Sequence, residues 1–266
     1  MTIYEVMLRT NHNIIKREFL SEKQKQNIVN MFLNSISTKD EALKFYKGVR
    51  FANNIDKEGR RMYPIYFIPP YNDGKKYKTV MTQTPKTHIL SANSYELEII
   101  RLLYLFDSKN SIVKGMVSNT IERLKTTCFG NSDDGVGECY DSSLIVLRFL
   151  ASVAPNEIKW INERIETFHR HFHEKHRVWC ITWYFYLCLS ELPFSIAEPE
   201  ILKYKDEFLK QLNRSCIMNS EHDKEIHPIL ICIIRNCLSR LSEYEYIKDR
   251  LPFVNPKDNR LYFNMN

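Results

Sequence analysis

The hydrophobic positions of the chain recur mostly at the spacing of an α-helix. Residues 13–35 carry apolar side chains at helical intervals among Lys, Glu and Gln, with an interruption near Ser21. From Ser94 onward, amphipathic segments at 112–124 and 156–176 alternate with segments that are nearly all apolar. The nearly apolar segments are 94–107, 142–153, 181–193 and 227–241. This pattern predicts a mainly α-helical protein.

One stretch, residues 62–82, departs from helical spacing. Residues 65–68 and 77–81 are β-branched and aromatic, and a turn signature at 72–74 separates them. These residues predict a small β-hairpin or extended loop. Nearby prolines would allow it only at the edge of a sheet, because proline has no backbone N–H to donate. The prediction divides the chain into an N-terminal helical segment (1–60), the β-hairpin or loop (61–90) and a helical-hairpin array (91–266), which together form one compact unit.

The helical part of the chain contains a degenerate repeat. Aligning Arg101 with Arg148, then Pro155 with Pro193, then Leu192 with Leu241 gives spacings of 47, 38 and 49 residues. Repeats of about 40 to 50 residues with two helices each are typical of stacked or circular helical arrays. We expect an α/α toroid, with an open solenoid as the alternative that satisfies the same spacing.

The glycines are concentrated in one loop. The chain has only seven glycines in 266 residues, whereas glycine usually makes up roughly 7% of a protein. Three of the seven lie between residues 130 and 137. The same loop carries Asp133, Asp134 and Glu138. One interpretation is a turn in which Asp141 or Ser142 caps the following helix. The other is a carboxylate cluster at the mouth of a cavity, which holds a cation or supplies a general acid.

The string from Asp134 to Glu138 is followed by Tyr140-Asp141 at the start of an apolar helix, and an aromatic run from Trp183 to Tyr186 comes later. In these two features the chain resembles the repeat of the terpene cyclase and protein prenyltransferase α/α toroids. The resemblance implies a toroid around a cavity for an apolar small molecule. Val136 stands where the family has an aromatic residue, and the DxDD motif of the cyclases is absent from the chain.

The candidate site residues follow from these patterns. Aromatic ring faces bind apolar groups and attract cations, so that an aromatic patch near residue 180 can line a pocket or simply pack in the core. The candidate catalytic residues are Asp133, Asp134 and Glu138, and the candidate ligand-binding residues are Trp179, Trp183, Tyr184, Tyr140 and Asp141.

A histidine-rich helix offers a weaker metal hypothesis. His169, His173 and His176 fall within about 60° of one another on a helix. Arg170 and Lys175 crowd this face with positive charge, and the HExxH motif of zinc proteases is absent. We therefore predict no metal site here, and no cofactor.

Charge, hydropathy and cysteine content limit the classes of partner and the compartment that we expect. The net charge of +6 comes from 38 basic and 32 acidic residues spread along the chain, which argues against nucleic acid. The longest uncharged run, residues 178–190, has 13 residues, whereas a membrane span needs about 18. Seven cysteines without a CxxC pair fit reduced thiols. We expect a cytoplasmic protein without a membrane span.

Two functions remain open at this stage. The first is a cavity protein that binds an apolar small molecule, with terpene-cyclase-like chemistry at the acidic loop as its catalytic form. The second is a non-catalytic helical scaffold that binds a protein or peptide on a concave surface. The sequence does not decide whether the protein is an enzyme.

Overall fold

The computed structural model describes residues 1–38, 41, 64–68, 76–85, 87–131, 139–172 and 179–265. Helix makes up 67% of the structure, which confirms the prediction of a mainly α-helical protein. The chain forms two compact units. One contains Met1–Arg9 and Leu20–Val178, and the other contains Thr10–Phe19 and Trp179–Asn266. Helix α1 (Ile3–Lys16) is divided between them.

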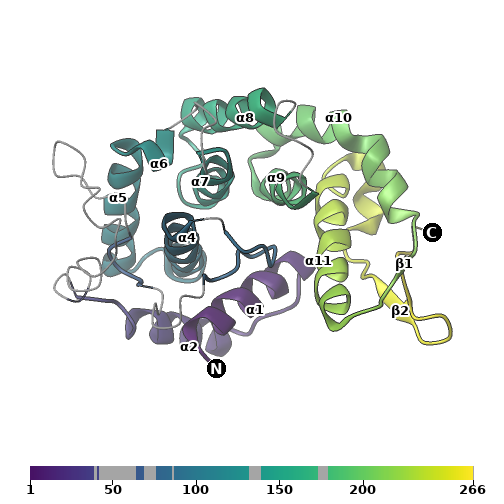
Figure 1. The fold of residues 1–266 in the computed structure, drawn as a ribbon, viewed down its shortest axis with the longest axis horizontal. Coiled ribbons are helices and arrows are strands. Elements are labelled where there is room, and N and C mark those ends of the chain that lie inside the picture. The colour runs from purple at the N-terminus through teal and green to yellow at the C-terminus, as the bar shows by residue number, and fades with distance from the viewer. Residues whose placement is uncertain are drawn as a thin grey trace. The chain divides into compact units, whose positions relative to one another are not determined.

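The first unit is built from two helical hairpins. The nearly apolar helices α4 and α7 contact each other, while the amphipathic helices α5 and α8 contact α4 and α7 respectively (Figure 1). α2 packs on α4, and the short α6 lies against α5 and α7. The elements are α2 (Glu22–Leu33), α4 (His88–Asp107), α5 (Ser111–Lys125), α6 (Cys128–Asn131), α7 (Cys139–Val153) and α8 (Ile158–Phe172).

Side-chain caps set the beginnings of these helices. Ser21 and Gln24 form a capping box at α2, in which each side chain accepts from the backbone N–H of the other residue. This box explains the predicted interruption near Ser21. Thr87 caps α4 by accepting from the backbone N–H of Leu90, and Asn110 caps α5. α4 ends at Asp107, as the pattern predicted.

From Leu90 to Leu103, α4 is buried on every side, and it is less apolar than its pattern suggested. Every residue from Leu90 to Leu103 is buried, including Asn93, Glu96, Glu98 and Arg101. Charged groups are costly to bury unless they are paired and hydrogen-bonded. The polar contacts of these side chains are therefore part of what holds the first unit together.

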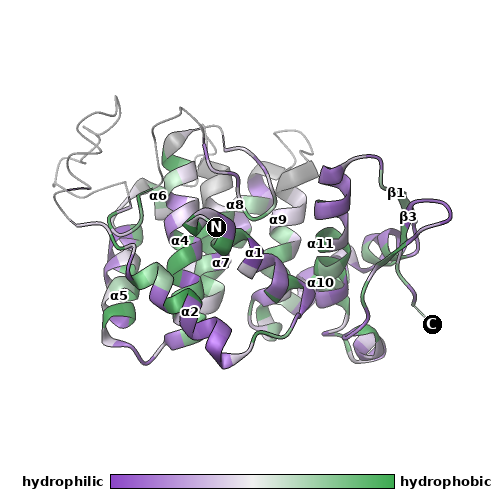
Figure 2. Ribbon diagram, turned by 90° about the horizontal axis from the view of Figure 1, so that it is seen from below, coloured by the Kyte–Doolittle hydropathy of each residue, from purple (hydrophilic) through white to green (hydrophobic). Residues whose placement is uncertain are grey.

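The second unit packs three helices against one another. α9 (Trp179–Glu191), α10 (Phe194–Leu212) and α11 (Glu221–Leu238) make mutual contacts, and the 3₁₀ helix η1 (Ser242–Ile247) follows α11. α11 changes from hydrophilic first turns to a hydrophobic remainder (Figure 2). The sequence pattern did not predict α10, which contains Pro199 near its start. Among the described helices, none has both the length and the apolarity to cross a bilayer.

A small antiparallel sheet near the C-terminus is a further element that the sequence pattern missed. Its order is β1 (Cys216–Ile217), β3 (Arg260–Tyr262), β2 (Phe253–Asn255). Leu261 on the central strand pairs with Cys216 on one side and with Val254 on the other. The strands have two or three residues each, which is too short for alternation to be recognised.

Of the two alternatives predicted for residues 62–82, the described part shows a loop and not a β-hairpin. The predicted turn at 72–74 lies outside the described residues, but residues 64–68 and 76–85 are described and contain no strand. The reason is that the backbone N–H groups of Ile65, Tyr66 and Phe67 donate to the Glu96 carboxylate instead of to a neighbouring strand. The predicted boundary between residues 60 and 61 also lies outside the described ranges, so the division into 1–60, 61–90 and 91–266 stays a prediction.

Candidate functional site

Most of the predicted acidic site lies outside the described residues. This holds for Asp133, Asp134 and Glu138. Tyr140 and Asp141 lie in the first turn of α7, where their backbone is described. Because α7 already begins at Cys139, Asp141 and its neighbour Ser142 stand inside the helix, and the prediction that one of them is its N-cap is wrong.

The predicted aromatic patch belongs to α9. Trp179 is its first residue, and the structure describes only its backbone. Trp183 and Tyr184 are 7% and 3% exposed. The ring of Trp183 meets that of Tyr186 edge to face, with 5.7 Å between ring centroids. In the described part of the second unit these rings contribute to the packing of α9.

Of the three predicted histidines, only His169 is described. It lies half-buried on α8, and its ring meets that of Phe168 edge to face, with 5.5 Å between centroids. His173 and His176 lie outside the described ranges. Within those ranges no cluster of three or more His, Cys, Asp or Glu has the geometry of a metal site.

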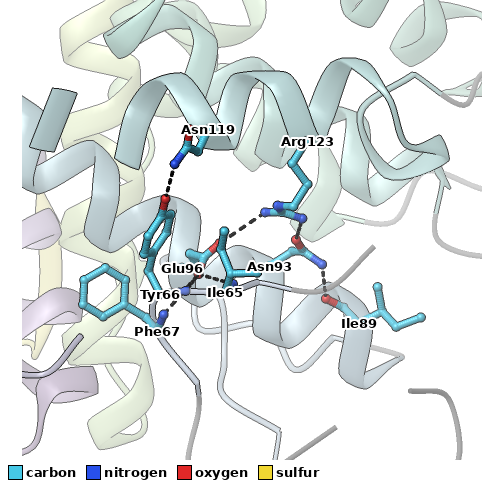
Figure 3. Close-up of polar contacts among 8 residues, drawn as sticks. All are labelled: Ile65, Tyr66, Phe67, Ile89, Asn93, Glu96, Asn119 and Arg123. Atoms are coloured by element: carbon cyan, nitrogen blue, oxygen red, sulfur yellow. Dashed lines mark hydrogen bonds and ion pairs between the residues drawn. The ribbon is translucent and has the colours of Figure 1, made fainter. Parts of the chain in front are cut away.

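A buried carboxylate, Glu96, organises the polar interior of the first unit (Figure 3). Its Oε2 accepts from the backbone N–H groups of Ile65, Tyr66 and Phe67 at 2.8, 2.6 and 3.1 Å. Its Oε1 accepts from Arg123 Nη2 at 3.3 Å. The single carboxylate therefore ties an irregular segment of backbone to α4 and α5.

Two neighbours complete this network. Arg123 Nη1 donates to Asn93 Oδ1 at 2.7 Å, and Asn93 Nδ2 donates to the carbonyl of Ile89 at 3.0 Å (Figure 3). The Tyr66 hydroxyl accepts from Asn119 Nδ2 at 2.7 Å. Burial raises the pKa of the Glu96 carboxyl, while Arg123 and the three backbone donors act against that rise. Because both carboxylate oxygens of Glu96 accept hydrogen bonds within the protein, we assign Glu96 a structural role.

A second buried carboxylate, Glu98, lies two residues after Glu96 and therefore on a different face of α4. Its Oε1 accepts from Arg148 Nη1 on α7 at 2.7 Å, and its Oε2 lies 3.8 Å from Arg101 Nη1 on α4. All three side chains are at most 3% exposed. This contact joins the two nearly apolar helices through charge rather than through packing alone.

The second unit contains a pocket of about 660 Å³ between α10 and the junction of α11 with η1. Arg17, just after α1, also lines it. Phe194 and Leu202 of α10 contribute apolar surface, and they are 38% and 50% exposed. They stand eight residues apart, about two helical turns, and therefore share one face of α10. Glu198 lies between them on the same face.

The pocket carries both signs of charge in equal number. Its basic lining residues are Arg17, Arg240 and Lys248, and its acidic ones are Glu198, Glu243 and Glu245. Two hydroxyls, those of Ser239 and Ser242, complete the polar lining. Such a surface suits a ligand that has apolar groups and charges together, because purely apolar ligands bind in pockets whose lining is mostly apolar.

Two arginines of the pocket are held by backbone carbonyls. Arg240 donates to the carbonyls of Leu189 and Leu192 at the end of α9, both at 2.6 Å. Its guanidinium also lies over the Phe194 ring, 5.2 Å from the centroid. Arg17 Nη1 donates to the carbonyl of Lys248 at 3.3 Å. These contacts fix where the positive charges stand.

Sequence reasoning missed this pocket. Arg17 and Lys248 are 231 residues apart in the chain, and no local pattern connects them. One signal was present in the repeat, where Ser190-Glu191-Leu192 aligns with Ser239-Arg240-Leu241. The change from Glu191 to Arg240 at equivalent positions marks the residue that caps the end of α9.

No protein-family description, curated protein or solved structure matches this chain. The resemblance of the 134–141 string to terpene cyclases and protein prenyltransferases therefore gains no support from these comparisons. The geometry of the chain's own residues is what a functional assignment has to rest on.

Proposed function

We propose that this protein is a non-catalytic helical scaffold that binds a segment of a partner protein in the pocket beside α10. The observation that carries the proposal is the juxtaposition of exposed Phe194 and Leu202 with a charged pocket. Peptide-binding surfaces combine apolar anchor positions with a polar rim. A peptide supplies apolar side chains and charges together, which is the combination that this lining complements.

The buried carboxylates in the interior of the first unit support the interpretation that the protein is non-catalytic. Glu96 and Glu98 are engaged by backbone N–H groups and arginines that link α4 to its neighbours. A general acid has to reach a substrate, whereas these groups are occupied in holding helices together. The cavity for an apolar small molecule stays a prediction, since its acidic loop lies outside the described residues.

The finer architecture that we propose is the helical-hairpin array of an α/α toroid. Applying the spacings of 47, 38 and 49 residues in turn to Arg101 gives Arg148, Tyr186 and Arg235, one residue on each nearly apolar helix. All four are buried. This equivalence supports a common repeat. Small-angle scattering tests it, because a compact chain of this length has a radius of gyration of about 18 Å, and an extended solenoid has a clearly larger one.

Peptide selection tests the proposed binding function. A library of random twelve-residue peptides is displayed on phage and selected on the immobilised full chain, and selected peptides are titrated by fluorescence anisotropy. We expect micromolar binders whose affinity falls at least tenfold on Leu202→Asp. Leu105→Asp is the matched control, because Leu105 is also an exposed helical leucine, at 45%, but lies on α4. Absence of enriched peptides, or equal affinity for Leu202→Asp, would overturn the proposal.

A further inference from the structure

Ser239 provides an unsatisfied polar group in the wall of the pocket. It is the C-cap residue of α11 and is 6% exposed. Its hydroxyl has no hydrogen-bond partner among the residues that the structure describes. A buried hydroxyl without a partner costs free energy. A ligand atom that accepts a hydrogen bond from Ser239 would remove this cost.

Two arginines line the same pocket as this hydroxyl. Arg240 follows Ser239 directly, and the two carbonyl contacts to α9 use two of its five N–H donors. Arg17 lines the same pocket, and its hydrogen bond to the Lys248 carbonyl uses one N–H. Both guanidiniums therefore have further N–H groups to offer to a ligand in the pocket.

The backbone helps to place Arg17. This residue has φ of 63°, in the left-handed region, and this conformation ends α1. Partial burial lowers the pKa of Arg17, and that of Arg240 is lowered by burial and further by the charge of Arg17. At Arg17 the charge of Asp249 acts against the lowering by burial. An anion placed beside both guanidiniums would stabilise their charged forms.

We propose that Ser239, Arg17 and Arg240 form a subsite for the carboxylate of an acidic residue in the bound peptide. This inference rests on the proposed peptide-binding function. Arginine donors bind carboxylates through charge-assisted hydrogen bonds, and the Ser239 hydroxyl adds a neutral donor. Because backbone carbonyls and the Phe194 ring hold Arg240, little conformational freedom is lost when the ligand binds.

The charge balance of the pocket favours a carboxylate over a phosphate. Glu198, Glu243 and Glu245 line the same pocket and match its three basic residues in number, and Glu243 is also paired with Lys205. A phosphate carries close to two negative charges at neutral pH, and the second charge would be repelled by Glu198 and Glu245. A carboxylate brings one charge, and the apolar residues beside it in the peptide reach Phe194 and Leu202.

The test uses the selected peptides and two variants that remove donors without removing packing. Ser239→Ala deletes the hydroxyl. Arg17→Gln deletes the guanidinium. Because Gln, like Arg, has an unbranched β-carbon, the variant should tolerate the positive φ of this residue as well as Arg does. Matched controls are Ser195→Ala and Arg214→Gln, which change exposed residues of the second unit outside the pocket lining. Titration calorimetry compares each peptide with its counterpart in which the acidic residues are replaced by their amides.

We expect the selected peptides to share an acidic residue and to lose at least tenfold in affinity on amide replacement. Ser239→Ala and Arg17→Gln should each lower the affinity for the acidic peptide at least fivefold and leave the affinity for the amide peptide unchanged. Both controls should bind the two peptides as tightly as the wild-type protein does. Peptides that bind through Leu202 but show no acidic preference would overturn this inference and leave the proposed function standing. A phosphoserine counterpart that binds tighter than the acidic peptide would overturn the choice of carboxylate.

Discussion

The Glu96 carboxylate and the Arg123 guanidinium lie 3.3 Å apart in the interior of the first unit, and both side chains are almost fully buried. The pair connects α4 to α5, and the same carboxylate accepts three backbone N–H groups from residues 65–67. An irregular segment with a β-like sequence is thus held by a helix side chain and needs no partner strand.

Replacing Glu96 by Gln should destabilise the protein by about 3 kcal/mol, because one acceptor oxygen becomes an NH₂ group facing other donors. Urea unfolding monitored by circular dichroism measures the change. Glu122→Gln is the control, since Glu122 is exposed on α5, and it should stay within about 0.5 kcal/mol of wild type. A loss below about 1 kcal/mol for Glu96→Gln would indicate that this carboxyl is protonated in the native protein.

Two glycines should respond to alanine with opposite signs. Gly115 lies inside α5 with open space where a β-carbon would be, so Gly115→Ala should stabilise by about 0.5–1 kcal/mol. A β-carbon on Gly130 would collide with the Leu124 carbonyl, and Gly130→Ala should destabilise by about 2 kcal/mol. Melting temperatures of the two variants provide the comparison. A shift in the same direction for both would contradict the described packing of α6 on α5.

Arg235→Lys should destabilise the second unit by about 2–3 kcal/mol. Arg235 is buried and donates to the carbonyls of Ile15, Lys16 and Arg250 at 3.2, 3.2 and 2.7 Å. A lysine ammonium lacks the planar fork that reaches several carbonyls at once. Chemical unfolding measures the loss. Exposed Arg214→Lys serves as the control, and equal stability of the two variants would show that the fork is not needed.

Tyr204 should make the second unit sensitive to alkali. Burial, and then the charge of Glu200, raises the pKa of Tyr204 from 10.0 to about 12. Because the folded state holds this proton more tightly than the unfolded state, its contribution to stability is complete below pH 10 and is lost as the pH rises toward 12. Urea midpoints at about pH 9 and about pH 11 should therefore differ less in Tyr204→Phe than in wild type.

The control for this pH experiment is Tyr246→Phe. Tyr246 is 54% exposed, and its replacement should leave the alkaline decrease as large as in wild type. The Tyr186 ring lies 5.2 Å from that of Tyr204, and its pKa is raised as well, so some sensitivity should persist in Tyr204→Phe. An unchanged pH dependence in that variant would assign the effect to other groups.

The sequence predicted the helices whose apolar residues recur over several turns. α4, α5, α7, α8, α9 and α11 all lie where the pattern placed a helix, and α4 ends at the predicted Asp107. The prediction of a strand at 65–68 was wrong. β-branched and aromatic residues indicate an extended backbone, but they do not indicate which group accepts hydrogen bonds from its N–H groups. That acceptor is Glu96, about thirty residues away.

The candidate site was harder to predict for a similar reason. Its lining residues come from the end of α1, from α10 and from the α11–η1 junction. Arginines and glutamates on amphipathic helices are usually solvated, and neither composition nor periodicity distinguishes those that border a pocket. In the register of the repeat Arg240 stands where Glu191 stands, and this difference could be interpreted only once the carbonyls of Leu189 and Leu192 were known to accept from Arg240.

The contact between Arg235 and α1 also affects how the chain is made. The carbonyl of Ile15 accepts from a side chain 220 residues later. At a synthesis rate of roughly 5–20 residues per second, the ribosome needs about 10 to 45 seconds to reach that arginine. During this interval the end of α1 has been synthesised but not its partner. The second unit therefore closes late in translation, and we expect nascent chains that stop before α11 to expose the end of α1 to chaperones and proteases.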